Sequence, residues 1–228
     1  MSMQTFFYYV FLVFGFFVFS FISWRKLRED YDVNLIFTLN LIFLLGGMSI
    51  GLVFARFLSA SMWGFLLGSL IIGWYAAKKM DFKIFEILDG VILGLVWLSL
   101  FFEAGLLVQF GWGKYFTNTL YLLIPILVLF CARYVLAGYR RFSWYPSGKI
   151  GFIGGASGLL YFSLLLLVDF ALGLMLSSSG KFIESGISFA VAFVFFIALY
   201  LRSGRRQAQR LLTAFQKKKR RKVFVNGG

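Results

Sequence analysis

The sequence contains no histidine and a single cysteine among its 228 residues. Without histidine, the chain lacks the side chain that most often serves as a general base near neutral pH. The lone Cys131 excludes a disulfide framework and any metal site that is built from cysteine pairs. Zinc and iron sites usually draw on these two residue types, so we expect no metal and no other cofactor.

Acidic residues are also scarce, since nine Asp and Glu face 23 Lys and Arg and leave a net charge of +14. On a soluble protein, such an excess would favour binding to nucleic acid. Here, however, 61% of the residues are hydrophobic, well above the roughly 45–50% of soluble domains. The basic residues lie between apolar stretches, where they set membrane orientation. We therefore expect a membrane protein and no nucleic-acid partner.

The apolar stretches predict an all-α polytopic membrane protein with about seven transmembrane helices in residues 1–202. A helix needs roughly 20 apolar residues to cross the hydrocarbon core. The third stretch is weakened by three glycines, and the last is short and extends back toward Phe182. The predicted spans are Phe6–Ser23, Leu35–Phe57, Ser59–Ala77, Phe85–Phe110, Thr119–Leu136, Gly151–Leu176 and Ile187–Leu201.

The basic residues between these spans predict the orientation of the chain. Only Arg56, Lys114 and Lys181 fall on one side, and every other Lys and Arg falls on the opposite side. Because basic loops stay in the cytoplasm, the N-terminus is expected outside and the C-terminus inside. Residues 203–228 form a basic cytoplasmic tail, which we interpret as a short amphipathic helix that contacts anionic lipid headgroups.

Three acidic residues fall inside predicted spans, where a charge is costly and suggests a function. Asp89 lies close to a basic loop, and we expect it to reach the membrane interface. Glu103 and Asp169 lie deeper, toward the outer side, where they either line a cavity for a polar headgroup or a cation or pair structurally with an Arg or a hydroxyl.

Glycine-rich and polar motifs run along the chain in a recognisable order. They are Leu45-Gly46-Gly47 with Gly51, Ser61-Met62-Trp63-Gly64 through Gly68, Lys78-Lys79 followed by Phe82 and Asp89, Phe102-Glu103-Ala104-Gly105, Thr117–Tyr121, Ser147-Gly148 with Gly151, and Gly180–Ser188. This order resembles the prolipoprotein diacylglyceryl transferases, which move a diacylglyceryl group from phosphatidylglycerol to a lipoprotein cysteine. The resemblance covers most of the chain and implies seven spans in the bacterial inner membrane, with phosphatidylglycerol and lipoprotein precursors as partners.

This chain departs from that family at the motif positions that carry the family's chemistry. Trp63 stands where the family has a histidine, Glu103 where it has a signature arginine, and Leu106 where it has an asparagine. If the reaction survives, Glu103 or Tyr121 serves in proton transfer and Arg56 holds the phosphate. The matching positions Trp63, Gly64, Gly105 and Asp169 are then expected to contact lipid.

Two other hypotheses remain beside a divergent transferase. A non-catalytic phospholipid-binding or scaffold protein on the same frame is favoured by the replaced motif residues. A small transporter is suggested by Glu103 and Asp169, although no internal repeat of the kind found in many transporters is visible. Whether the chain is an enzyme stays open at the level of sequence.

Overall fold

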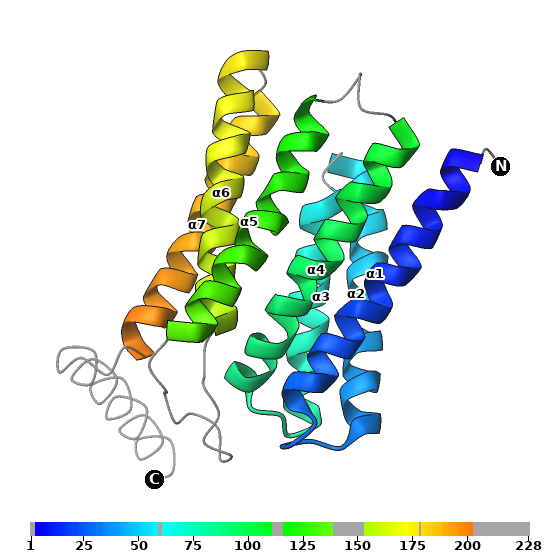
Figure 1. The fold of residues 1–228 in the computed structure, drawn as a ribbon, viewed down its shortest axis with the longest axis vertical. Helices are drawn as coiled ribbons and strands as arrows, with labels where there is room; N and C mark the ends of the chain where they lie inside the picture. Colours follow the sequence, from blue (N-terminus) through cyan, green and yellow to red (C-terminus); the bar gives the residue numbers. More distant parts are fainter. Residues whose placement is uncertain (1–2, 59–60, 111–115, 139–152, 178, 203–228) are drawn as a thin grey trace, which may run out of the picture.

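The computed structural model describes residues 3–58, 61–110, 116–138, 153–177 and 179–202 (Figure 1). In these segments the chain is helical, and no strand occurs. The predicted tail, residues 203–228, lies outside the described residues. The helices are α1 Met3–Leu27, α2 Val33–Leu58, α3 Ser61–Lys79, α4 Ile84–Phe110, α5 Phe116–Gly138, α6 Ile153–Leu176 and α7 Ser179–Arg202.

Six of the helices in the described segments are long and apolar enough to cross a membrane, which confirms a multi-pass helical architecture. The exception is α3, where glycines, tryptophans and two terminal lysines dilute the apolar residues of a 19-residue helix. The seventh span was predicted to begin at Ile187 or near Phe182, but α7 begins at Ser179. The helix extends further because Lys181 and Glu184 pair with each other inside its first turns.

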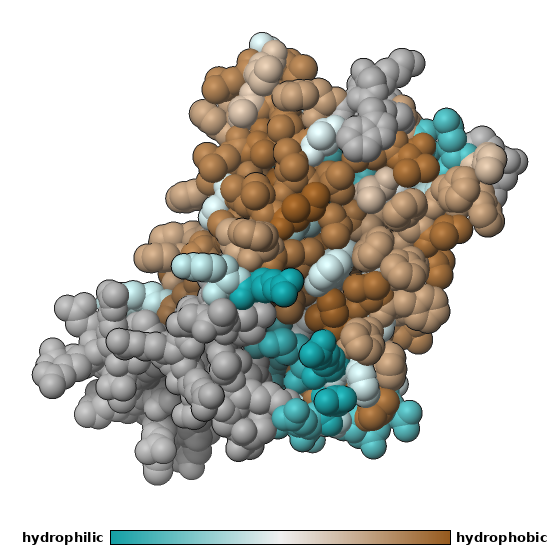
Figure 2. Space-filling view, in the orientation of Figure 1, coloured by the Kyte–Doolittle hydropathy of each residue, from teal (hydrophilic) through white to brown (hydrophobic). Residues whose placement is uncertain are grey.

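The helices run alternately up and down, so the bundle has an upper end that holds Met3 and a lower end that holds the α1–α2 turn (Figure 1). Arg25 and Lys26 end α1, and Lys78 and Lys79 end α3, all at the lower end. Figure 2 shows most of the polar surface at that end, a smaller polar patch at the upper end, and apolar surface over the middle of the molecule. The described helices therefore separate the charges in the way that the sequence predicts.

Close helix pairs form the frame of the bundle: α1 packs on α4, α2 on α3, and α6 on α7, while α4 also contacts α5 and α6. Glycines allow these approaches. A methyl group on Gly68 would meet the backbone carbonyl of Gly46, and one on Gly94 would meet the Phe19 ring at 2.7 Å. In lipid, helices associate through such small residues because no hydrophobic force draws them together.

The main core lies in the lower half, where residues of α1, α2, α3 and α4 form one buried cluster that includes Phe19, Ile36, Leu39 and Val91. A second cluster joins α4, α5 and α6 around Val128. The central α4 takes part in both clusters. It therefore connects the lower core to the upper ends of α5, α6 and α7, where the candidate site lies.

Candidate functional site

Charged and hydroxyl side chains from three helices meet near the upper end of the bundle. The Tyr121 hydroxyl on α5 donates a hydrogen bond to Oδ1 of Asp169 on α6 at 2.5 Å. Nζ of Lys181 on α7 donates to the Tyr121 hydroxyl at 2.9 Å and lies 3.5 Å from Asp169 Oδ1. The same amine pairs with Glu184 at 2.5 Å. We call these four residues the upper cluster.

Local structure explains how these side chains meet. Ser177 adopts a left-handed backbone with φ of 50°, which ends α6 and reverses the chain into α7. Lys181 then lies in the first turns of α7 and reaches back toward α5 and α6. Its ammonium lies 5.2 Å from the centre of the Tyr121 ring, a cation–π contact. Asp169 is 3% exposed, so these charge-assisted bonds offset the cost of removing its carboxylate from water.

Glu103, a predicted proton-transfer residue on α4, lies on the edge of this cluster. Lys181 acts on its carboxylate electrostatically, and the carboxylate in turn acts on Tyr8 of α1 and Tyr161 of α6. Among the described residues Glu103 forms neither a hydrogen bond nor an ion pair, although its side chain is partly buried. The pairing with Arg56 that the sequence allowed is not formed. The oxygens of Glu103 are therefore available to a proton or a ligand.

The other predicted site residues lie apart from the upper cluster. Arg56 is exposed in the last turn of α2. Gly64 packs against Phe54 of α2, and Gly105 packs against Tyr8 of α1. Trp63 lies in α3, but its side chain is outside the described residues. The structure thus joins Tyr121 to Asp169 and places Glu103 within electrostatic range of Lys181. A role of the other residues in lipid contact stays a prediction.

Lys181 and Glu184 are the two members of the upper cluster that the sequence reasoning missed. Both were assigned to the region before the last span because charges normally end a transmembrane stretch. Their spacing of three residues, which places an acid and a base on one helix face, was the signal available in the sequence.

Asp89 is buried near the lower end of α4, and its position relative to the membrane interface stays a prediction. Its side chain is 2% exposed, and its Oδ1 accepts a hydrogen bond from the backbone N–H of Gly154 at 2.5 Å. Gly154 is in the first turn of α6, where backbone N–H groups lack partners within the helix. The carboxylate therefore caps α6 from the side of α4, and the favourable helix dipole explains its burial.

A second polar cluster, formed by Tyr31, Lys83 and Glu86, lies at the lower end. The Tyr31 hydroxyl donates to the Glu86 carboxylate and accepts from the Lys83 backbone N–H at 3.1 Å. The Lys83 ammonium lies 3.6 Å from Glu86 Oε1. Burial and then the bond to Glu86 raise the pKa of Tyr31 from its ordinary value of 10.0 to about 12. This cluster ties the α1–α2 turn to the start of α4.

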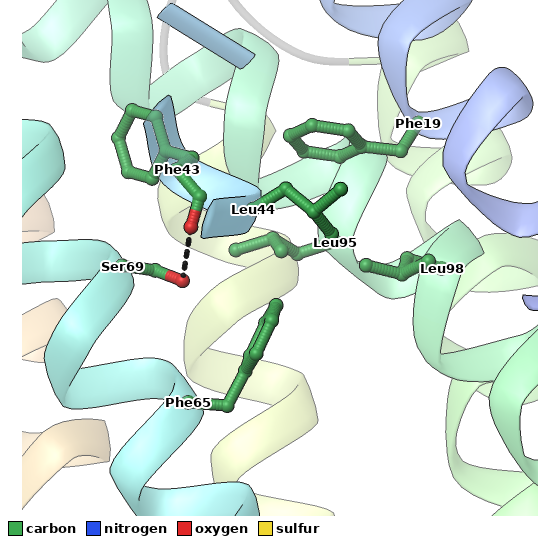
Figure 3. Close-up of a pocket in the computed structure, with 7 residues that line it drawn as sticks. All are labelled: Phe19, Phe43, Leu44, Phe65, Ser69, Leu95 and Leu98. Carbon is green, nitrogen blue, oxygen red and sulfur yellow. Dashed lines mark hydrogen bonds between the residues drawn. The ribbon is translucent and has the colours of Figure 1, made fainter. Parts of the chain in front are cut away.

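Of the hollows in the described structure, two bear on where a lipid could bind. Figure 3 shows Phe19, Leu95 and Leu98 around a small cavity of about 10 Å³, beside which the Ser69 hydroxyl donates to the Phe43 carbonyl at 2.9 Å. Its size and apolar lining make it a packing defect and exclude a lipid headgroup. The other hollow is an open groove of about 320 Å³ at the α6–α7 turn. It is lined by Gly173, Leu174, Ser177, Ser179 and Phe182.

Comparisons of the chain with protein-family models, with curated proteins and with solved structures find no match. The resemblance to the diacylglyceryl transferases therefore stays a prediction from motif order. Chemical interpretation of the upper cluster depends on its own geometry. Among the described residues, no group of His, Cys, Asp and Glu is arranged to hold a metal ion.

Proposed function

We propose that this protein is a seven-span bacterial inner-membrane protein, with its N-terminus outside, that handles phospholipid headgroups at the upper cluster and transfers a diacylglyceryl group to a lipoprotein cysteine. The observation that supports this proposal is the meeting of Tyr121 and Asp169, two residues selected from sequence, with the ammonium of Lys181. Placing an ionisable group within the membrane costs free energy, and three helices contribute side chains to the upper cluster.

The chemistry of the transfer matches the groups that are present. The cysteine sulfur attacks the terminal glycerol carbon of the diacylglyceryl group, a C–S bond forms, and the C–O bond to the phosphate breaks. The thiol proton needs an acceptor, and the glycerol phosphate leaves with the bonding electrons. Glu103 has free carboxylate oxygens for the proton, and Lys181 supplies positive charge for the departing phosphate. The proposal thus moves the phosphate contact from Arg56 to Lys181.

The groove at the α6–α7 turn supports the same proposal. The groove lies at the upper end of the bundle. Its lining residue Ser179 is two residues before Lys181 in the sequence. The groove is a shallow, open surface that a headgroup can reach without entering the bundle. Leu174 on its wall and the neighbouring Met175 and Leu176 are strongly exposed apolar residues. An acyl chain would contact these residues while the headgroup lies in the groove.

One observation favours a second candidate, a non-catalytic phospholipid-binding protein. The Lys181 ammonium is already paired with Asp169 and Glu184. Two carboxylates more than neutralise one ammonium, so a phosphate must displace at least one of them before it gains a counter-ion. A protein that holds lipid through its exposed apolar side chains, with no phosphate at Lys181, needs no such exchange.

A direct transfer assay tests the proposal. The purified full-length protein in nanodiscs that contain phosphatidylglycerol receives a peptide with a lipobox cysteine, and the mass of the peptide is followed. We expect a gain of one diacylglyceryl group. Tyr121→Phe, which removes the hydroxyl between Asp169 and Lys181, is expected to lower the rate at least about 100-fold, the scale of lost acid–base catalysis.

The matched control is Tyr134→Phe, on the same helix but 80% exposed, which is expected to leave the rate unchanged. Equal rates for Tyr121→Phe and the unmodified protein would remove the upper cluster from the reaction. Absence of any mass gain would reject transfer. Retention of phosphatidylglycerol over phosphatidylcholine through detergent purification, measured by native mass spectrometry, would then identify the non-catalytic candidate.

A further inference from the structure

The ammonium of Lys181 is surrounded by as many oxygens as it has donors. A lysine ammonium carries three N–H donors and no acceptor. The three oxygens are the Tyr121 hydroxyl at 2.9 Å, Glu184 Oε2 at 2.5 Å and Asp169 Oδ1 at 3.5 Å. A phosphate that binds Lys181 must therefore replace one of them.

Asp169 is poorly suited to give up its place beside the ammonium. Its side chain is 3% exposed, and the Tyr121 hydroxyl on α5 bonds the same oxygen that faces Lys181. Without the ammonium, the carboxylate would be a buried charge that water does not reach, which is strongly destabilising. Tyr121 is also held, because its hydroxyl bonds Asp169 and Lys181 at the same time.

Glu184 differs from Asp169 in each of these respects. Its side chain is 29% exposed, so water can solvate its carboxylate once the ion pair opens. Among the described residues, this side chain bonds Lys181 and no other group. The two residues are three positions apart on one helix, and exposed pairs of this kind contribute little to stability. Of the three oxygens, that of Glu184 is displaced at the lowest cost in free energy.

The groove at the α6–α7 turn lies on the opposite side of Lys181 from Glu184. Successive residues of an α-helix are about 100° apart around its axis, so the groove residues Phe182 and Ser179 lie about 100° and 160° to one side of Lys181. By the same geometry, Glu184 lies about 60° to the other side. The ion pair with Glu184 thus draws the ammonium away from the groove. When the pair opens, the flexible lysine side chain can turn toward the groove.

We propose that Glu184 occupies the position of the lipid phosphate on Lys181 while no lipid is bound, and that an anionic phospholipid displaces it. This inference rests on the proposed binding of phospholipid headgroups at the upper cluster. The displacement exchanges one anion for another on the same ammonium, so the charge around the buried Asp169 does not change. A lipid without a phosphate brings no anion for this exchange and leaves the ion pair closed. Glu184 is thus a positioning residue, which acts on the lipid through Lys181.

Titration with a water-soluble lipid tests the proposal on the full-length protein in a neutral detergent. Dihexanoyl phosphatidylglycerol is the probe, and native mass spectrometry gives the concentration at which half of the protein has bound it. Glu184→Gln removes the competing charge at nearly constant size. An exposed ion pair is worth up to about fivefold in an equilibrium constant, so we expect the half-saturating concentration to fall about two- to fivefold. Glu29→Gln, the same change at an exposed position between α1 and α2, is the control and should leave it unchanged.

A second probe separates competition with the phosphate from a general loosening of the groove. Dihexanoylglycerol has the same acyl chains and no phosphate, so Glu184→Gln should leave its half-saturating concentration unchanged. An equal gain for both lipids, or no gain for phosphatidylglycerol, would overturn the inference. In either case, saturable binding of phosphatidylglycerol would leave the proposed lipid site in place. Absence of saturable phosphatidylglycerol binding in every variant would overturn both the inference and the proposed function.

Discussion

At the residue scale, Lys181 decides the structure of the upper end, because one ammonium group contacts α5, α6 and its own helix. Its side chain is 29% exposed, whereas that of Asp169 is 3% exposed. The buried Asp169 carboxylate therefore needs Lys181 as its counter-ion, whereas solvent can stabilise part of the Lys181 charge. A carboxylate left in the bilayer without its counter-ion is costly.

Replacement of Lys181 by methionine tests this dependence. Lys181→Met keeps the length of the side chain but leaves the Asp169 carboxylate without its counter-ion, which we expect to destabilise the protein by on the order of 2 kcal/mol. The measurement is the thermal unfolding midpoint in nanodiscs. Lys79→Met, at an exposed position in the last turn of α3, is the control and should leave the midpoint in place. Equal midpoints for the two variants would show that the ion pairs stabilise nothing.

Tyr31 gives a prediction that depends on pH. Its pKa is raised to about 12 in the folded protein, so its contribution to stability is complete below pH 10 and is lost as the pH rises toward 12. The reason is that only the protonated hydroxyl donates to Glu86. We expect the unfolding midpoint to fall over this interval and the fall to be smaller in Tyr31→Phe. Tyr75→Phe, which is 70% exposed, serves as the control. The same decline in both variants would contradict the assignment.

At the element scale, glycines determine which helices pack closely. Gly154 of α6 lies so near α4 that a methyl group would be 2.7 Å from Cα of Asp89 and 2.9 Å from the carbonyl oxygen of Leu88. Both are backbone atoms, which a side-chain rotation cannot move. The approach also allows the Gly154 N–H to reach the Asp89 carboxylate, so one glycine provides both the contact and the cap of α6.

Two glycine-to-alanine variants separate packing from helix propensity. Alanine favours a helix over glycine by about 1 kcal/mol, and a methyl group on Gly186 of α7 would meet nothing within 4 Å. We therefore expect Gly186→Ala to raise the unfolding midpoint or leave it unchanged. Gly154→Ala should lower the midpoint, because α6 must move away from α4. A Gly154→Ala protein as stable as Gly186→Ala would disprove the close contact.

At the scale of the whole molecule, the bundle has two different polar ends. The lower end is basic and contains the cluster of Tyr31, Lys83 and Glu86. The upper end has few described basic residues, and there Lys181 is engaged by carboxylates. Because basic residues face the cytoplasm, this asymmetry supports a cytoplasmic lower end.

Cysteine labelling in intact cells tests that orientation. In a Cys131→Ser background, Met3→Cys at the upper end is expected to react with a membrane-impermeant maleimide added outside. Lys79→Cys at the lower end should react only after the membrane is permeabilised. Both positions are exposed, and Met3 is 75% exposed. The reverse pattern would invert the orientation and place the upper cluster on the cytoplasmic side.

Much of the helical architecture could be predicted from the sequence, because a helix that spans lipid must satisfy its backbone internally and present apolar side chains. The third predicted stretch, which its glycines weaken, corresponds to α3, the described helix that falls short as a membrane span. The start of α7 could not be predicted, because charge normally ends a span and the sequence does not show that Lys181 and Glu184 have partners. Of the candidate site, Tyr121, Asp169 and Glu103 were selected, whereas Lys181 was not.

The sequence by itself determined the helical membrane class, the separation of basic residues to one end, and the presence of acids within long apolar helices. These properties depend on composition and order along the chain. Only the tertiary structure decided the partners of those acids: Asp169 with Tyr121 and Lys181, and Asp89 with the N–H of Gly154. The physical reason is that hydropathy fixes how deep a residue lies in the membrane but not the direction its helix face points. A buried charge is stabilised by the partner that its side chain reaches, and the direction of the helix face decides which partner that is.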